Sequence, residues 1–320
     1  MSTSNKAWDW AVVNNAGYDY YKMCEQTGIS KPPRDIKIWV FKGFPSSSAP
    51  MLRRVHHPIG INGNNDWVNY IINTSLGLAV SIVHQLVKKV LPDITIGTQS
   101  GSYRKIYDFT NHELAHASHF SKVGSAFWAR YISYIITNLG YGNGTTPDAE
   151  LCGVGEMWGY AMGHIQENEK YDPAKFEKPY SYNNADWLKP HVFWDLYRGN
   201  VLTKKQIYDC LTADVDTYDK LAAKMYGNYP EKADMIEKAF TDNKIILNVT
   251  KPDTGDITHD AFYTDKTVAY SIIFSGNNIL AQNVTVTNNA KLTFRANNSV
   301  TIDSPFTIHQ GAQLEISCVN

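Results

Sequence analysis

Cysteine is scarce in this chain of 320 residues. The four cysteines, Cys24, Cys152, Cys210 and Cys318, stand far apart and form no C-x-x-C pair. A zinc ribbon and a dithiol redox motif are therefore excluded, because both need cysteines at that spacing. The thiols are expected to be buried, while one or two disulfides stay open for an oxidising compartment.

A surplus of charge is also missing. Thirty Lys and Arg face thirty-one Asp and Glu, which leaves a net charge of −1. The basic residues form no block that neutralises a run of phosphates, and such neutralisation supplies most of the affinity for nucleic acid. Nucleic acid is therefore excluded as the expected partner.

Long apolar runs are missing as well. The first six residues contain no signal-peptide segment, so the chain is expected to be either cytoplasmic or a mature form that has lost its targeting segment. Residues 67–87 carry no charge and are long enough to cross a bilayer. No transmembrane segment is predicted, however, because this stretch holds too many polar groups for lipid: Asn69, Asn73, Thr74, Ser75, Ser81, His84 and Gln85.

The apolar residues, 43% of the chain, are enough to form a sizeable core. Their spacing predicts helices over residues 5–27, 66–91, 125–139 and 147–164, and short strands over 36–41 and 93–98. Near residue 245 the composition changes to Val, Ile, Thr, Asn and Gly. We therefore expect an α+β fold, with a mainly helical domain and a small sheet over residues 1–245, followed by a small all-β domain over 246–320.

The C-terminal part repeats itself. The pattern that begins Val284-x-Val286 and ends Leu292-x-Phe294 recurs 22 residues later, beginning Phe306-x-Ile308 and ending Leu314-x-Ile316. Such self-similarity with strand-like alternation predicts stacked β-rungs (a β-solenoid) or a small β-sandwich. Since no cluster of His, Asp or Glu accompanies the repeat, an accessory or anchoring module is expected.

Residues 109–120 hold the strongest chemical signal. His112, Glu113 and His116 form an H-E-x-x-H pattern, in which histidines four apart lie on one helical face and can share one zinc ion. The glutamate beside them can act as a general base. Phe109 and Phe120 lie on the same stripe, so the histidines are expected between apolar neighbours, which favours a zinc site over a solvated helix.

A third ligand is expected from the next helix. Gly155, Gly159 and Gly163 fall four apart on one of its faces, and glycines in register predict the close approach of another backbone, here that of the motif helix. Glu156 lies beside this face and is the predicted third metal ligand. Glu150 is the competing residue, but its place in the first turn is explained by the helix dipole alone.

Two further histidines need a role. Ligands at i, i+4 and i+7 span roughly 10 Å along a straight helix, which is too far for one ion, so His119 is expected to support the site or the fold.

The stretch 171–200 is rich in Tyr, Trp, Asn and Pro. There His191, or one of its tyrosines, is a candidate donor to the oxyanion of a tetrahedral intermediate, with aromatic packing as the alternative.

The assembled pattern resembles the gluzincin type of zinc metallopeptidase, in which H-E-x-x-H supplies two ligands and a glutamate on a following helix the third. The resemblance covers about residues 93–165. It implies a zincin-like catalytic domain with Zn²⁺ as cofactor. It also implies that His112, His116 and Glu156 are metal ligands and that Glu113 is the catalytic base.

The chain departs from two related patterns. It has His119 and Lys122 where metzincins need a glycine and a third histidine. Tyr160 stands where the thermolysin-like pattern has an aspartate, four residues after the third ligand. An orienting carboxylate must then come from elsewhere, with Asp108 as the candidate.

The expected function is that of a metallopeptidase that acts on peptide or protein substrate through a metal-activated water. The strand at 93–98 is either an ordinary edge strand or one that binds extended peptide by strand addition, as in zinc peptidases. The alternative function is a catalytically silent, zinc-containing surface protein that binds glycan or protein. The repeat-bearing tail is similar to C-terminal segments of bacterial secreted or surface proteins, which suggests secretion or the cell envelope and contact with the cell surface or glycan through the tail.

Overall fold

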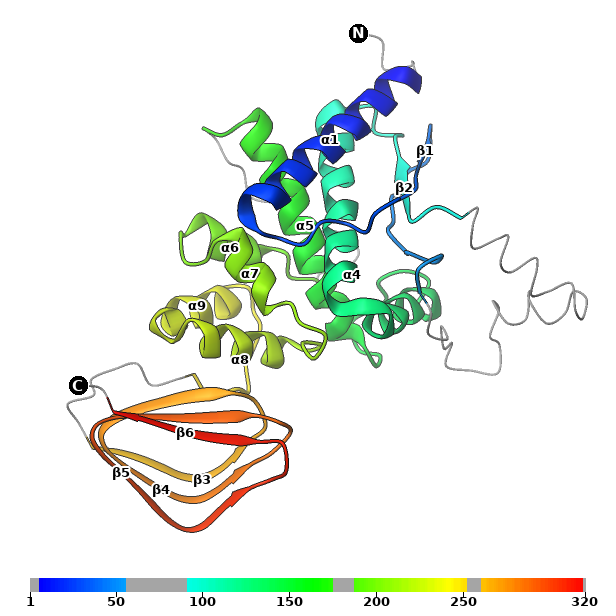
Figure 1. The fold of residues 1–320 in the computed structure, drawn as a ribbon. Coiled ribbons are helices and arrows are strands. Elements are labelled where there is room, and N and C mark those ends of the chain that lie inside the picture. The colour runs from blue at the N-terminus through cyan, green and yellow to red at the C-terminus, as the bar shows by residue number, and fades with distance from the viewer. Residues whose placement is uncertain (1–5, 56–90, 175–186, 252–259, 319–320) are drawn as a thin grey trace, which may run out of the picture. The chain divides into compact units, whose positions relative to one another are not determined.

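The computed structural model describes residues 6–55, 91–174, 187–251 and 260–318, and these residues mix helices and strands (Figure 1). The mixed α and β character predicted from the sequence is thus confirmed. The helices are α1 (Lys6–Thr27), α4 (Tyr103–Thr137), α5 (Ala149–Tyr171), α6 (His191–Arg198), α7 (Lys204–Cys210), α8 (Tyr218–Asn228) and α9 (Ala233–Asp242). The strands are β1 (Ile38–Phe41), β2 (Ile94–Gly97), β3 (Ala261–Val268), β4 (Ile272–Val286), β5 (Lys291–Ile308) and β6 (Gln313–Cys318).

The chain forms two compact units. The first comprises Met1–Asp195 and Lys204–Asp216, and the second comprises Leu196–Thr203 and Thr217–Asn320. The second unit therefore includes α8 and α9 as well as β3 to β6. The domain boundary expected at residue 245 stays a prediction, and the helix expected over 66–91 lies almost wholly outside the described residues.

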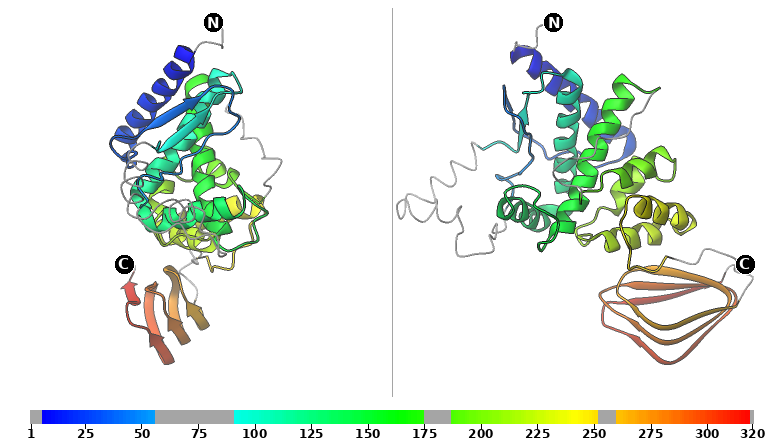
Figure 2. Two further views of the ribbon diagram at one scale, coloured as in Figure 1. Left: turned by 90° about the vertical axis from the view of Figure 1, so that its right-hand side faces the viewer. Right: turned by 180° about the vertical axis from the view of Figure 1, so that it is seen from behind.

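Helix α4 is the centre of the first unit, with α1 and α5 packed against it (Figures 1 and 2). On the α1 side the Tyr107 hydroxyl donates a hydrogen bond to Asp19 over 2.9 Å. On the α5 side the buried indole of Trp158 donates to the carbonyl of Ala115 over 3.1 Å. A side chain on each neighbouring helix is thus bonded to α4, so both helices are held against the motif.

The close approach predicted from the glycines of α5 is confirmed. A Cβ built on Gly159 would lie 2.7 Å from Nε2 of His116, and one on Gly163 would lie 2.5 Å from a carboxylate oxygen of Asp108. Such separations are below those of real Cβ contacts. Only glycine at these two positions allows α5 to lie so close to the motif face of α4.

Helix α4 is kinked at Gly124, whose φ of 80° and ψ of −177° are not helical. Only glycine adopts this combination readily. The segment after Gly124 therefore leaves the direction of the motif segment, as the separate helix predicted over 125–139 requires. Its side chains return to the motif, since the Trp128 and Tyr131 rings lie 5.9 and 5.7 Å from the His116 ring.

The small sheet consists of β1 and β2 in parallel. Asp93, fully buried just before β2, accepts hydrogen bonds of 2.9 Å from Arg53, Arg54 and the backbone of Lys37. On the side of β2 away from β1, Ser48 and Thr95 exchange backbone hydrogen bonds of 2.8 and 2.9 Å. The expectation that a peptide binds to β2 by strand addition is therefore wrong at the centre of the strand, because the chain itself pairs with both of its edges there.

The second unit contains a parallel sheet in the order β3-β4-β5-β6. Residues 287–290 and 309–312 join its last three strands, and such short connections cannot carry a chain back to a parallel start. The long strands must therefore turn within themselves, and the register of β4 with β5 shifts at two points along them. This arrangement stacks rungs and is not a β-sandwich.

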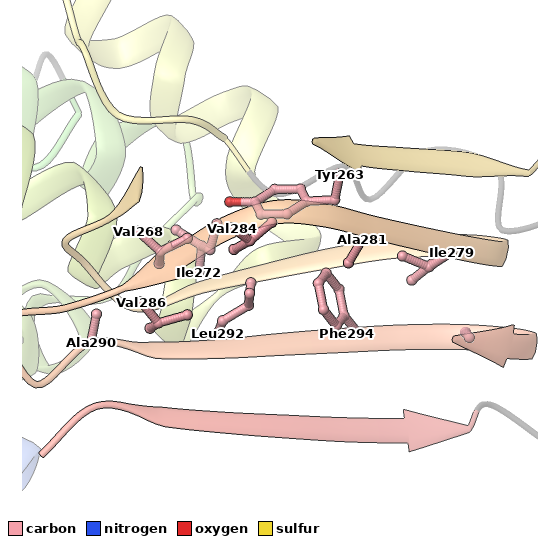
Figure 3. Close-up of a cluster of buried hydrophobic side chains, with 11 residues drawn as sticks. Tyr263, Val268, Ile272, Ile279, Ala281, Val284, Val286, Ala290, Leu292 and Phe294 are labelled. Carbon is pink, nitrogen blue, oxygen red and sulfur yellow. The ribbon is translucent and has the colours of Figure 1, made fainter. Parts of the chain in front are cut away.

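The 22-residue repeat predicted from the sequence is the stacking register of these rungs. Val286 lies opposite Ile308, and Leu292 lies opposite Leu314. The apolar side chains of successive strands meet in one buried cluster (Figure 3). Polar side chains stack as well, because Asn278 donates to Asp260 over 2.7 Å and accepts from Asn298 over 2.8 Å.

The structure also bears on the cysteines and on the question of a membrane-spanning helix. Cys24, Cys152 and Cys210 are free and buried, as expected for packed thiols. Among the helices that the structure describes, none is both long and apolar enough to cross a bilayer.

Candidate metal centre

The motif side chains lie together on the buried face of α4. Nε2 of His112 and Nε2 of His116 are 3.0 Å apart, and a carboxylate oxygen of Glu113 lies 3.9 Å from Nε2 of His112. One possible ligand atom from each residue falls within 4.8 Å of the others, so the three residues can face one metal ion. Both imidazoles point a ring nitrogen at the same place because they are one helical turn apart.

Glu156 of α5 joins these residues. Its two carboxylate oxygens lie 3.5 Å from Nε2 of His112 and 3.6 Å from Nε2 of His116. Gly159 makes this approach possible, because the helix surface there carries no side chain. We refer to His112, Glu113, His116 and Glu156 together as the four-residue cluster.

The cluster fits a tetrahedral zinc ion. Ligand atoms bound at 2.0 to 2.1 Å in a tetrahedron are about 3.3 Å apart. Nε2 of His112 and Nε2 of His116 are 3.0 Å apart, and each lies close to that value from a different oxygen of Glu156, at 3.5 and 3.6 Å. Two imidazoles and one carboxylate are also a donor set that catalytic zinc sites use. These three residues would hold the ion, and Glu113 would lie beside it.

Burial sets the charge of the cluster. The pKa of His112 is lowered to about 3 by burial and by the neighbouring His116, so its imidazole is neutral and ready to bind a cation. Burial, followed by the charge of Glu156, raises the pKa of Glu113 well above its ordinary value. Burial also acts to raise the pKa of Glu156, but His116 and the bonded phenol of Tyr131 act against it, and that pKa is lowered.

Two tyrosines, Tyr131 and Tyr141, bond the carboxylate of Glu156, a third, Tyr160, lies beside Tyr141, and the sequence analysis missed all three. The hydroxyl of Tyr131 donates to one oxygen, and the hydroxyl of Tyr141 donates to the other over 3.2 Å. The Tyr141 and Tyr160 hydroxyls are 2.9 Å apart, and the Tyr160 ring lies 4.3 Å from that of His112. Gly124 and the glycine-rich turn around Tyr141 were the available signals, because both change the direction of the chain near the motif.

His119 lies outside the four-residue cluster. Its ring packs 5.2 and 5.9 Å from the rings of Phe127 and Trp128, and it is fully buried. Neither of its ring nitrogens has a hydrogen-bond partner within the described residues. This packing agrees with the supporting role in the site or the fold that was expected for this histidine.

The remaining candidates lie outside the four-residue cluster. His191 is the first residue of α6 and is half-buried. The aromatic contacts described above for His112 and His116 are made by tyrosines and Trp128. Glu150 is exposed in the first turn of α5. Asp108 lies against Gly163, and no hydrogen bond in the described part of the chain joins it to His112. The side chains that donate hydrogen bonds to Glu156 are Tyr131 and Tyr141.

Comparisons of the chain with protein-family models, with curated proteins and with solved structures found no match. A function is therefore inferred from the four-residue cluster itself.

Proposed function

We propose that this chain is a zinc-dependent metallopeptidase of the gluzincin type, whose catalytic part is a mainly helical, zincin-like domain with a small sheet. His112, His116 and Glu156 would be the metal ligands, and Glu113 the catalytic base. The observation that carries the proposal is the convergence of two imidazoles and a carboxylate, 3.0 to 3.6 Å apart, beside a second buried carboxylate.

The residues of the chain divide the chemistry between them. When bound, Zn²⁺ supplies Lewis-acid activation of water and of the scissile carbonyl. Glu113 takes a proton from the attacking water and returns it to the leaving amine. Burial suits this carboxyl to the task, since a general base works best when its pKa lies nearer the operating pH than that of a free glutamate.

The oxyanion of the tetrahedral intermediate needs a hydrogen-bond donor. His191 was the candidate from the sequence, with the tyrosines near it. The phenol of Tyr160 is better supported, because its ring packs on His112 and its hydroxyl lies 2.9 Å from that of Tyr141, whose own O–H is donated to Glu156. A phenolic hydroxyl is a suitable donor for developing negative charge.

The test compares zinc content and hydrolysis in one set of proteins. The wild type is expected to hold about one equivalent of zinc and to cleave labelled unfolded casein. Glu113→Gln should keep the zinc and lose the cleavage, because only the proton acceptor is removed. Glu150→Gln is the matched control at an exposed glutamate of the first unit. Cleavage by Glu113→Gln at the wild-type rate would contradict the assignment of the base.

A second function is favoured by one observation, the burial of the cluster. Its side chains are no more than 7% exposed, which suits a structural zinc site in a catalytically silent surface protein that binds glycan or protein. Structural sites are closed by four protein ligands, whereas catalytic sites keep a position for water or substrate. Acetohydroxamate added to the Co²⁺-loaded protein should change its visible spectrum if a position is open, and leave it unchanged if the site is closed.

The parallel β-rungs are proposed as an accessory module. Their apolar residues face one another and their corners carry stacked amides, with no group of metal-ligating side chains among the described residues of that part. Contact with the cell surface or a glycan, and a secreted or cell-envelope location, remain proposals from the resemblance of this tail.

A further inference from the structure

The carboxylate of Glu156 is held at both oxygens. The oxygen nearer His116 accepts a hydrogen bond from Tyr131, and the oxygen nearer His112 accepts one from Tyr141. The side chain is only 2% exposed, so water contributes little to its solvation. The two phenols therefore fix the plane in which the carboxylate faces the two imidazoles.

Several features of the chain bring Tyr131 to this position. Gly124 breaks α4 with backbone angles that only glycine adopts readily, and the segment after it returns toward the motif. Trp128 stacks on Tyr131 at 4.7 Å and orients its ring. A Cβ on Gly155 would lie 3.1 Å from the Tyr131 ring, so the glycine provides room for it. Tyr131 is 5% exposed, and the hydrogen bond that its hydroxyl makes within the described residues is to Glu156.

Tyr141 reaches the other oxygen from the turn between α4 and α5. Gly140 and Gly142 on either side of it have φ values of 124° and 58°, which reverse the chain and direct it back to α5. The Tyr141 hydroxyl also meets that of Tyr160, whose ring lies on His112. The phenols thus connect one oxygen of Glu156 to the side of the cluster that contains His112.

We infer that Tyr131 and Tyr141 are positioning residues, which hold the carboxylate of Glu156 so that it completes a metal site with His112 and His116. The inference rests on the proposed function, since it concerns the same metal. Partners of a metal ligand orient it and, when removed, typically weaken metal binding by roughly 10 to 100-fold. In this chain, uncharged phenols supply the hydrogen bonds that orient the carboxylate ligand.

The experiment measures metal binding directly. Zn²⁺ affinity of the full chain is determined by competition with a chromophoric chelator for wild type, Tyr131→Phe, Tyr141→Phe and the double variant. Phenylalanine keeps each ring and removes only the hydroxyl. Tyr226→Phe is the matched control, because Tyr226 is fully buried and its hydroxyl has no hydrogen-bond partner within the described residues. The visible spectrum of the Co²⁺-loaded proteins reports the geometry of the ligands.

Each single variant is expected to bind Zn²⁺ roughly 10 to 100-fold more weakly, with changed Co²⁺ bands, while Tyr226→Phe matches the wild type. Unchanged affinity and spectrum in the double variant would overturn the inference and leave the proposed function intact. A fall in the thermal stability of the metal-free variants without loss of affinity would also overturn it, because the phenols would then be merely structural. A wild type that binds no Zn²⁺ would overturn both.

Discussion

Gly159→Ala offers a sharp test of how the cluster is built. The added methyl group would lie 2.7 Å from Nε2 and 2.8 Å from Cε1 of His116, and 3.0 Å from Cε1 of His112. Ordinary contact begins at 3.4 Å, so the His116 ring must move by about 0.7 Å, the difference between 3.4 and 2.7 Å, or α5 must move away. Either response acts on the predicted ligands and leaves the sequence of the motif unchanged.

Gly159→Ala is expected to affect Zn²⁺ affinity more than the stability of the fold. Overpacking of a core costs about 1–3 kcal/mol, while alanine in place of a helical glycine returns about 1 kcal/mol. The net loss of stability is therefore about 0–2 kcal/mol, and the protein should stay folded. Metal–ligand distances, in contrast, tolerate only about 0.2 Å. A displacement of about 0.7 Å should thus lower the Zn²⁺ affinity at least tenfold.

The assay is chelator competition on the folded protein, with urea unfolding as the measure of stability. Gly17→Ala in α1 is the matched control, since a Cβ there meets nothing within 4 Å. It should stabilise the protein by up to about 1 kcal/mol and leave the Zn²⁺ affinity unchanged. Wild-type Zn²⁺ affinity in Gly159→Ala would refute the reasoning that His116 binds the metal directly opposite this glycine.

Three other predictions concern the ligands and the fold. Glu156→Ala should lose most of the bound zinc in metal analysis, whereas Glu150→Ala should keep it; equal zinc in both would overturn the choice of third ligand. Burial lowers the pKa of His119 to about 3, so its contribution to stability is present above pH 6.5 and is lost as the pH falls toward 3. In His119→Leu the free energy of unfolding should therefore depend less on pH between 3 and 6.5. An unchanged pH dependence in that range would contradict burial of His119 as its cause. Asp93→Asn should cost about 3 kcal/mol in urea unfolding, because it breaks a buried ion pair with two arginines, and a cost below about 1 kcal/mol would show that the pair contributes little.

The features that sequence analysis predicted well depend on local spacing. Histidines four apart must share a helical face, and glycines four apart on α5 must present a strip without side chains. The 22-residue repeat likewise appears as the register between β4, β5 and β6, because a stacked rung repeats the residues of the rung beneath it. In each case the geometry of one element determines the contact.

The features that sequence analysis missed depend on how separate segments meet. Tyr131 reaches Glu156 because the chain changes direction at the Gly124 kink, and the backbone angles of a single glycine cannot be predicted from apolar spacing. Ser48 pairs with the side of β2 away from β1 through backbone groups, which every residue has. The identity of its side chain therefore did not predict this pairing. The role expected for His191 came from composition alone, and it stays a prediction.

The most direct test of the account is crystallography of the zinc-soaked protein at the zinc absorption edge. The account predicts one anomalous peak bonded to Nε2 of His112, Nε2 of His116 and the carboxylate of Glu156, with Glu113 beside it and not bonded. A peak elsewhere, or a protein that binds no zinc at this cluster, would contradict it.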